Sequence, residues 1–321
     1  MRIALPPAID GSAFAEHDPT APIVTLEGLT MGTTWRVLLV GGRRFDAAAV
    51  RAAIVARLGA IVAEMSHWET SSLLSRFNRA AAGSWTVLPP DFAQVMAAGL
   101  RIAAVTGGAF DPAVGRLVDL WGFGPPGPMP PPDAAAIEAA RAASGWQKLA
   151  FDPAARRLRQ PGGVALDLSG IAKGFAVDAV AQLLRDGGMR HGLVEIGGEL
   201  AGFGIRPDGE PWWVDLETPP GMDVAPLRVA LHGLAVATSG DYRRGAHNLD
   251  PRSGRPADLG VVSVSVVHNN AMEADAWATA LTVLGPDAGI AAAEAAGIAA
   301  RIVGGGGEER LSVALRAMIE E

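Results

Sequence analysis

Glycine and proline occur about once in every five residues of this chain, and this frequency predicts a fold with many turns. The 321 residues include 40 glycines and 23 prolines, less than the share of roughly a quarter or more that marks low-complexity disorder. Hydrophobic residues make up 49% of the chain and charged residues 19%, so the chain can bury a large core. We therefore expect a globular protein, with a length that suits one large unit or two domains.

Strand and helix patterns are mixed along the sequence without a strict βαβ repeat, which favours an α+β fold. Short β-branched runs on both sides of Met31-Gly32-Thr33-Thr34 predict a hairpin, and apolar residues three or four apart predict the helices. Residues 66–78 are predicted to be irregular, and Gly285-Pro286 to stop the last helix. We expect strands over 23–26, 35–40, 147–152, 156–160, 164–168 and 260–268, a meander of strands over 192–236, and helices over 46–65, 91–106, 133–143, 171–185 and 271–284.

Composition excludes several classes of protein. The chain has no cysteine, which excludes disulfide frameworks, thiolate zinc sites and cysteine nucleophiles. The formal net charge is −7 and the basic residues form no runs, so we expect no nucleic-acid partner. Apolar stretches such as 54–65 and 288–300 are too short or too interrupted by glycine to cross a bilayer, so we expect no membrane span.

The N-terminal residues 1–14 contain two adjacent prolines and an aspartate where a secretory signal needs an unbroken apolar stretch. We therefore expect a cytoplasmic protein, with a periplasmic location as the alternative if the N-terminus is incomplete. We expect residues 22–321 to form the folded unit and residues 1–21 to form an extension, for which disorder is one alternative.

The stretch 166–178 combines charged groups with a turn. Asp167 ends an apolar run, Ser169-Gly170 predicts a turn, and Lys173 opens a helix. Lysine is scarce, with Lys148 the second of two, so its presence here suggests a specific use. A carboxylate, free backbone amides and an ammonium around one point would suit a phosphate or diphosphate with its metal. The alternative is a capped helix with a surface lysine.

Asp275 and Thr279 lie four residues apart on the helix predicted over 271–284, so their oxygens project from the same face. The rest of that face is small and apolar. Mg²⁺ prefers oxygen ligands and is often bound by a carboxylate together with substrate phosphates. The pair is compatible with a magnesium site, although an aspartate on an amphipathic helix, taken alone, usually faces solvent.

The loop 238–254 holds the only tyrosine of the chain, three arginines and His247. His247 with Asp250 offers a general base and a partner that could orient it. A structural turn is the alternative. The other histidines show no metal-ligand spacing, and no role is predicted for His17, His67, His191, His232 and His268.

Two further segments carry weaker signals. Ala109-Phe110-Asp111 follows two glycines at a predicted helix end, and Trp68 lies in the polar segment before the second helix. An aromatic side chain on a loop can stack on a planar ring or cover the core. The glycines of 122–127 match a dinucleotide-binding pattern, but two prolines within it remove the amides that a pyrophosphate needs, so we interpret it as a loop.

Taken together, these segments resemble the ApbE family of flavin transferases, which move FMN from FAD onto a serine or threonine of an acceptor protein. The likeness rests on the order and spacing of short motifs over about residues 25 to 285. These motifs are Met31-Gly32-Thr33, Ser75-Arg76-Phe77-Asn78, Phe110-Asp111-Pro112-Ala113-Val114-Gly115, Leu120-Trp121-Gly122-Phe123, 167–178, Gly197-Gly198, Ser239-Gly240-Asp241-Tyr242, 247–254 and Ala274-Asp275-Ala276 to Leu281.

The resemblance implies a single ApbE-like unit over 22–321, with two α/β subdomains around a central FAD cleft as one arrangement. Carried over residue by residue, it implies a base at His247 and places Lys173 near the diphosphate. Trp68 stands where many relatives have tyrosine, and it keeps the capacity to stack. The FAD contacts implied are Met31, Trp68, Ala109, Phe110, Asp111 and Asp167, and the Mg²⁺ ligands are the Gly170 carbonyl, Asp275 and Thr279.

The activity implied is Mg²⁺-dependent transfer of FMN from FAD to a serine or threonine hydroxyl of an acceptor flavoprotein, with release of AMP. The alternatives are an FAD diphosphatase that yields FMN and AMP, and a non-catalytic FAD-binding protein.

Overall fold

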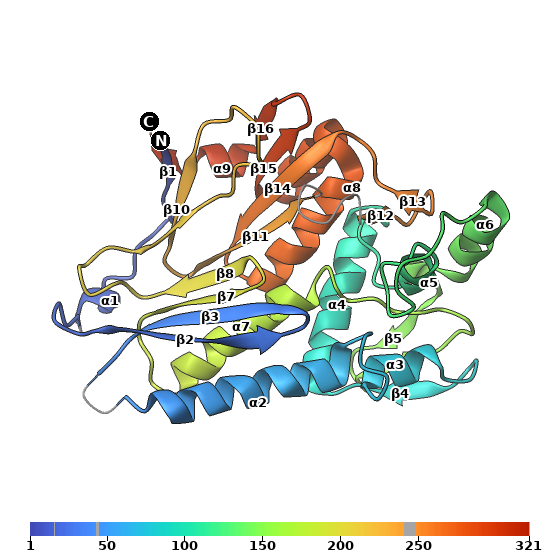
Figure 1. Ribbon diagram of the computed structural model, residues 1–321, viewed down its shortest axis with the longest axis horizontal. Helices are drawn as coiled ribbons and strands as arrows, with labels where there is room; N and C mark the ends of the chain where they lie inside the picture. The colour runs from blue at the N-terminus through green and yellow to red at the C-terminus, as the bar shows by residue number, and fades with distance from the viewer. Residues whose placement is uncertain (16, 43–44, 241–247, 321) are drawn as a thin grey trace.

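The structure, a computed structural model, describes residues 1–15, 17–42, 45–240 and 248–320. Its centre is an eight-stranded sheet in which every neighbouring pair is antiparallel (Figure 1). From one edge to the other, its strands are β16 (Glu309–Leu311), β15 (Ala299–Gly304), β14 (Val261–His268), β11 (Leu234–Gly240), β8 (Glu199–Phe203), β7 (Gly192–Ile196), β3 (Thr33–Val40) and β2 (Ile23–Thr30).

Strands β2 and β3 form the predicted hairpin at one edge of this sheet. Met31 and Gly32, with φ of 49° and 71°, make its two-residue turn. Trp35 pairs with Gly28 and is 1% exposed. A methyl group on Gly28 would lie 2.7 Å from the indole Nε1, so only glycine lets this tryptophan lie flat against the neighbouring strand.

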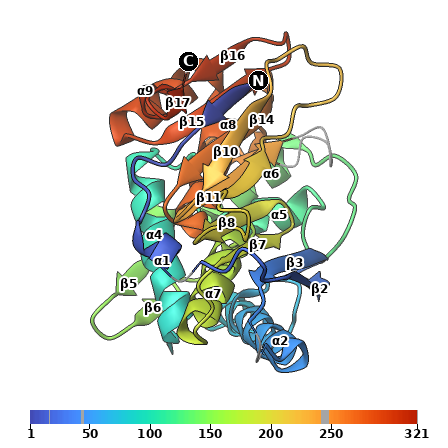
Figure 2. The same cartoon turned by 90° about the vertical axis from the view of Figure 1, so that its left-hand side faces the viewer.

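Two long helices pack against each other and against the sheet (Figures 1 and 2). Helix α7 (Ala172–Asp186) contacts β7 and β8, while α8 (Ala271–Ala296) contacts β11 and β14. Gly174 faces the backbone carbonyl of Ala271 so closely that a side chain there would collide with it. The glycine therefore sets how near the two helices approach.

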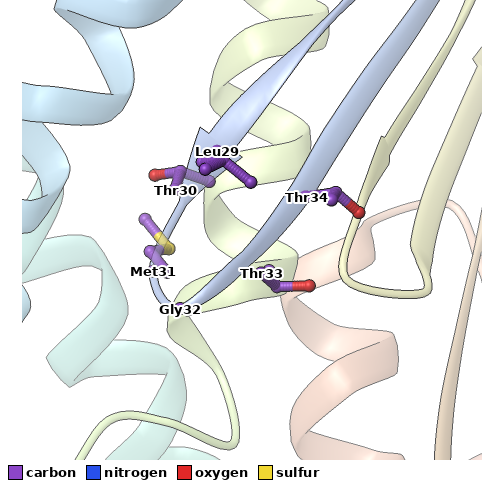
Figure 3. Close-up of a pocket in the computed structure, with 6 residues that line it drawn as sticks. All are labelled: Leu29, Thr30, Met31, Gly32, Thr33 and Thr34. Atoms are coloured by element: carbon purple, nitrogen blue, oxygen red, sulfur yellow. The ribbon is translucent and has the colours of Figure 1, made fainter.

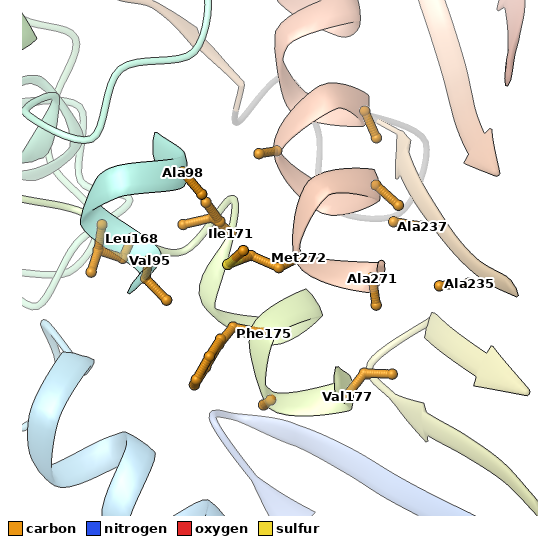
Figure 4. Close-up of a cluster of buried hydrophobic side chains, with 14 of the residues drawn as sticks. Val95, Ala98, Leu168, Ile171, Phe175, Val177, Ala235, Ala237, Ala271 and Met272 are labelled. Carbon is orange, nitrogen blue, oxygen red and sulfur yellow. The ribbon is translucent and has the colours of Figure 1, made fainter. Parts of the chain in front are cut away.

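Helices α2 (Ala47–Met65) and α4 (Pro90–Val105) complete the main helical layer, with α2 against α7 and α4 against α8. Figure 4 shows apolar side chains at this junction, where α4, α7 and α8 meet. The cluster gains free energy by removing its apolar surface from water. It fixes the start of α7 relative to α8, which positions the site described below.

Smaller elements surround this core. A three-stranded sheet has the order β4 (Trp85–Val87), β6 (Arg157–Arg159), β5 (Ala150–Asp152), and β12 (Leu249–Asp250) pairs with β13 (Arg255–Pro256). The short helices are α1 (Ser12–Ala15), α3 (Leu73–Asn78), α5 (Gly115–Leu120), α6 (Ala134–Ala143), η1 (Trp146–Lys148) and α9 (Val313–Arg316). Within the described ranges, no helix combines the length and apolar character needed to cross a membrane.

The two ends of the chain meet in a second sheet (Figure 1). Its order is β17 (Ile319–Glu320), β1 (Arg2–Ala4), β10 (Leu227–Leu231), β9 (Trp212–Asp215), and β1 runs parallel to β10. Disorder was one alternative for residues 1–21. Within them, Arg2–Ala4 pairs on both sides with later parts of the chain.

The α+β class is confirmed, and so are the hairpin and most predicted helices, but two local predictions are wrong. Residues 164–168 form no strand, because their hydrogen bonds go to the Asn78 side chain and the Pro112 carbonyl instead of a neighbouring strand. The segment 66–78 is not wholly irregular, since Ser72 caps α3 by accepting from the Ser75 amide at 2.9 Å. The predicted stop at Gly285-Pro286 is confirmed: Gly285 is non-helical, with φ of 81° and ψ of 177°, and Pro286 suits the first turn of a second helical segment of α8 that runs to Ala296.

Candidate functional site

The β2–β3 turn lines a hollow of about 590 Å³ (Figure 3). Met31 lies at this turn, is partly buried and packs on the core, whereas Leu29 is 82% exposed. A positive φ at a methionine costs free energy, and the two-residue hairpin turn requires it here because both central residues have a positive φ. The turn also touches β7–β8, because the Gly197 amide donates to the Thr34 carbonyl at 3.1 Å.

The turn between β7 and β8 leads directly into a buried carboxylate, Glu199. This side chain is 4% exposed, and it accepts a hydrogen bond from the ammonium of Lys173 in the first turn of α7. Burial raises the pKa of Glu199 to about 7, although the charge of Lys173 opposes the shift. Sequence analysis did not predict this residue, and its one signal was its position after Gly197-Gly198.

Asp275 lies on the other side of the same lysine. Its Oδ1 atom is 3.8 Å from the Lys173 ammonium, and its Oδ2 atom accepts from the Gly174 amide at 3.0 Å. Burial raises the pKa of Asp275, against the opposing effects of Lys173 and that amide. The structure therefore brings the predicted Asp275 and Lys173 together in one buried cluster with Glu199.

Thr279 lies one helical turn beyond Asp275 and faces the predicted turn at Gly170. A methyl group on Gly170 would lie 2.9 Å from Thr279 Oγ1 and 3.5 Å from the Phe110 ring. The predicted ligands Gly170 and Thr279 are thus neighbours, and Asp275 projects from the same helix. Carbonyl, hydroxyl and carboxylate oxygens are the donor types that Mg²⁺ prefers, so these residues fit a magnesium ion. Among the described residues, no three His, Asp or Glu side chains form a metal cluster. The set of Gly170, Asp275 and Thr279 is of a different kind, because it contains one carboxylate together with a hydroxyl and a backbone carbonyl.

The backbone amides at the start of α7 are less available than predicted. Ile171 and Ala172 both donate to the Leu168 carbonyl, and Gly174 donates to Asp275. The prediction of several free amides at this turn is therefore wrong for these three. The reason is that a tight turn precedes the helix and Asp275 closes it from the neighbouring helix.

Phe110 and Asp111 follow α4 as predicted and are buried with Ala109. The two oxygens of Asp111 accept from the Ala113 amide at 2.7 Å and the Trp146 amide at 3.1 Å. Burial raises the pKa of Asp111 to about 6, although these two donors oppose the shift. Asp111 thus holds two loops together, and a role in FAD contact stays a prediction.

A second charged cluster lies beside Trp68, and sequence spacing did not reveal it. His67 has its Nε2 atom 3.2 Å from Asp119 and its Nδ1 atom 3.3 Å from Asp167. Burial lowers the pKa of His67, but the two carboxylates outweigh it and raise the pKa to about 9. For Asp167 burial acts in the opposite direction and raises the pKa. His67 and the two Ser169 donors outweigh burial and hold the pKa of Asp167 below its usual value. Trp68 itself is 61% exposed.

The predicted base, His247, lies outside the described residues. Asp250, its expected partner, is described and accepts from the backbone and side-chain nitrogens of Arg252 at 2.9 and 2.8 Å. Asp250 therefore shapes its own loop as an aspartate turn does. Whether His247 acts as the base stays a prediction.

Comparison with known proteins decides the family of this chain. The sequence profile of the ApbE family matches residues 31–302. The chain belongs to the ApbE family. It is 38% identical over 289 residues to the FAD:protein FMN transferase of Klebsiella pneumoniae (strain 342), covering 86% of this chain and 83% of that protein. The FAD:protein FMN transferase of Haemophilus influenzae is 35% identical over 303 residues, 88% of this chain and 86% of that protein.

Solved ApbE structures share the fold. The apo form of the Pseudomonas stutzeri flavinyl transferase ApbE has a TM-score of 0.87 at 37% identity, with 93% of this chain and 97% of that chain covered. The flavin transferase ApbE from Vibrio cholerae has a TM-score of 0.86 at 34% identity, with 93% and 99% covered. The α+β architecture is therefore that of ApbE proteins, and membership in the family makes this chain a transferase.

The ApbE motifs read from the sequence converge only in part on the described site. The motifs that contain Gly170, Lys173 and Asp275 meet between α7 and α8. The motif 120–123 follows Asp119, which meets His67 and thereby reaches Asp167. Asp119 had no signal beyond its position next to that motif.

Proposed function

We propose that this chain transfers FMN from FAD to a serine or threonine hydroxyl of an acceptor flavoprotein, with Mg²⁺ as cofactor and AMP as the leaving product. One observation carries the proposal: Gly170 touches Thr279, one turn from Asp275, beside the ammonium of Lys173. Hard oxygen donors and a cationic side chain at one point suit a diphosphate with its metal. The names of the ApbE relatives support the same donor and product.

Phosphoryl transfer of this kind needs positioning and charge neutralisation more than covalent chemistry by the protein. Gly170, Asp275 and Thr279 would hold the magnesium ion, which would offset the negative charge of the diphosphate. Lys173 would add a second positive charge near the same phosphates. Because the whole chain carries a net charge of −7, this local concentration of positive charge is needed to hold an anionic substrate.

The transfer is a nucleophilic displacement at phosphorus. The acceptor hydroxyl oxygen forms a bond to the phosphorus on the FMN side, and the bond from that phosphorus to the bridging oxygen breaks. AMP leaves with that electron pair, and the hydroxyl proton passes to a base. His247 is our candidate for that base.

Residues around the metal site would hold the rest of FAD. Trp68 offers an exposed indole that can stack on a planar ring, and Met31 lines the hollow at the β2–β3 turn. Asp167 offers a carboxylate that stays ionised, because its pKa lies below the usual value. Ala109, Phe110 and Asp111 would contribute the wall next to Gly170.

The test is to incubate the protein with FAD, Mg²⁺ and a candidate acceptor, then to look for flavin fluorescence in the acceptor band of a denaturing gel. Fluorescence on the acceptor together with AMP supports the proposal. Free FMN and AMP without labelled acceptor would instead identify an FAD diphosphatase. Bound FAD that never yields AMP would identify a binding protein.

A matched pair of variants tests the metal assignment. Asp275→Asn should abolish AMP release, because it removes the charged metal ligand. Asp287→Asn changes a residue in the second helical segment of α8, where the side chain is 86% exposed and pairs with Arg310, and this variant should keep full activity. Equal activity of both variants would contradict the role of Asp275.

A further inference from the structure

Glu199 is a buried carboxylate outside the residues expected to touch FAD or metal. Its Oε1 atom accepts from Lys173, and its Oε2 atom is buried with no hydrogen-bond partner among the described residues. Burying a carboxylate with an unused oxygen costs free energy of folding. Its presence at the start of β8 therefore needs an explanation other than stability.

The backbone holds Glu199 at a fixed place. Gly197 and Gly198 make the preceding turn with φ of 63° and 102°. A methyl group on Gly197 would lie 2.9 Å from Thr33, and the Gly197 amide bonds to the Thr34 carbonyl at 3.1 Å. Glu199 is thus anchored to the β2–β3 hairpin, whereas Lys173 reaches it through a flexible side chain.

Lys173 stands between two buried carboxylates and is closer to one of them. It bonds to Glu199, while Asp275 Oδ1 remains 3.8 Å from its ammonium. When both carboxylates are ionised, one ammonium between them leaves one net negative charge, which favours a cation. Without the charge of Glu199, Lys173 and Asp275 would neutralise each other, and a metal ion would have to break that pair to reach Asp275.

We infer that Glu199 is a positioning residue that draws the Lys173 ammonium away from Asp275 and keeps the Asp275 carboxylate open to a divalent cation. The inference rests on the proposed function, which places Mg²⁺ at Asp275. Loss of a group that orients metal ligands typically lowers metal affinity about 10–100-fold. Glu199 acts here through Lys173 and not by contact with the ion.

The experiment is a double-mutant cycle read by metal binding alone. Mg²⁺ is titrated by calorimetry into the EDTA-treated full chain, into Glu199→Gln, into Lys173→Met and into the double variant. Glu199→Gln should weaken Mg²⁺ binding about tenfold or more when Lys173 is present. In the Lys173→Met background it should change affinity by no more than about twofold. Equal weakening in both backgrounds would overturn the inference, since Glu199 would then act by its charge alone.

Glu195→Gln is the matched control, because Glu195 lies on β7 and pairs with Arg36 with 29% of its side chain exposed. It should leave Mg²⁺ affinity unchanged, and weakening equal to that of Glu199→Gln would also count against the inference. A crystal structure of Glu199→Gln gives a second readout. The Lys173 ammonium should move into direct contact with Asp275, and a lysine that stays at its present distance would overturn the inference.

These readouts separate the two proposals. Absence of Mg²⁺ binding by the unaltered chain would contradict the proposed function. The position of Lys173 in the Glu199→Gln crystal structure would still decide whether Glu199 holds it away from Asp275.

Discussion

The Nδ1 atom of His67 lies 3.3 Å from Oδ2 of Asp167, and the opposite ring nitrogen lies 3.2 Å from Asp119. The histidine therefore links the loop of Trp68 to helix α5 through Asp119 and to the loop of Asp167. Its side chain is 8% exposed, so water screens these ion pairs only weakly. The charge on His67 thus contributes both to stability and to the placement of Asp167.

This link predicts a pH-dependent contribution to stability. The pKa of His67 is raised from 6.5 to about 9 in the folded protein, so its contribution is complete below about pH 6.5 and disappears as pH rises through about 9. His67→Gln should lower the free energy of unfolding by about 2 kcal/mol at pH 6, and by much less at pH 10. Urea unfolding at several pH values measures this difference, and a difference that stays constant from pH 6 to pH 10 would show that His67 is not the titrating group.

A second prediction concerns the close approach of Gly170 to Thr279. Gly170→Ala puts a methyl group 2.9 Å from the Thr279 hydroxyl, which should destabilise the fold by about 1–3 kcal/mol and weaken Mg²⁺ binding. The same substitution at Gly59 meets nothing within 4 Å on the exposed face of α2 and should stabilise the protein by about 0.5–1 kcal/mol. Thermal unfolding with and without Mg²⁺ tests both signs, and a neutral Gly170→Ala would contradict the packing at this position.

Trp68 gives a prediction about binding without a change in stability. Because its side chain is 61% exposed, Trp68→Ala should leave the unfolding temperature nearly unchanged but weaken FAD binding about tenfold through loss of stacking. Trp68→Phe should keep most of the affinity. Trp85→Ala, on β4 at 45% exposure, is the control and should bind FAD normally. Flavin fluorescence quenching measures the affinities, and full affinity in Trp68→Ala would exclude stacking at this residue.

Asp111 should matter for stability even without substrate. Each carboxylate oxygen of Asp111 accepts from one backbone amide, of Ala113 or of Trp146. Asp111→Asn replaces one of these oxygens with an NH₂ group and leaves one amide without an acceptor, so we expect the free energy of unfolding to fall by about 1–3 kcal/mol. Asp287→Asn on the surface should change stability by less than about 0.5 kcal/mol. Denaturant unfolding of both variants provides the comparison, and equal stabilities would mean that the Asp111 bonds contribute little.

Local sequence patterns indicate structural features that depend on residues close together in the chain. Asn270 caps α8 by accepting from the amide of Glu273, three residues further along the chain, at 2.9 Å. Asp275 and Thr279 share a helix because a helix repeats every 3.6 residues, whatever surrounds it. The predicted helix over 271–284 was confirmed because spacing along the chain sets this geometry.

A strand needs a neighbouring strand to accept and donate its hydrogen bonds, and the local sequence does not show which segment that is. Residues 164–168 have an apolar pattern that is typical of a strand, yet the Asn78 side chain and the Pro112 carbonyl take their hydrogen bonds. Their apolar side chains are buried, which satisfies the same pattern without a sheet. The pattern indicated burial correctly and the element incorrectly.

By itself, the sequence determined the longer helices, the hairpin, the order of the ApbE motifs and the pairing of Asp275 with Thr279 on one helix face. Only the tertiary structure decided that Glu199 meets Lys173 and that His67 meets Asp119 and Asp167. The physical reason is that these contacts join residues on different elements. The order of strands in the sheet and the packing of α7 against α8 set such contacts, and no local period along the chain records them.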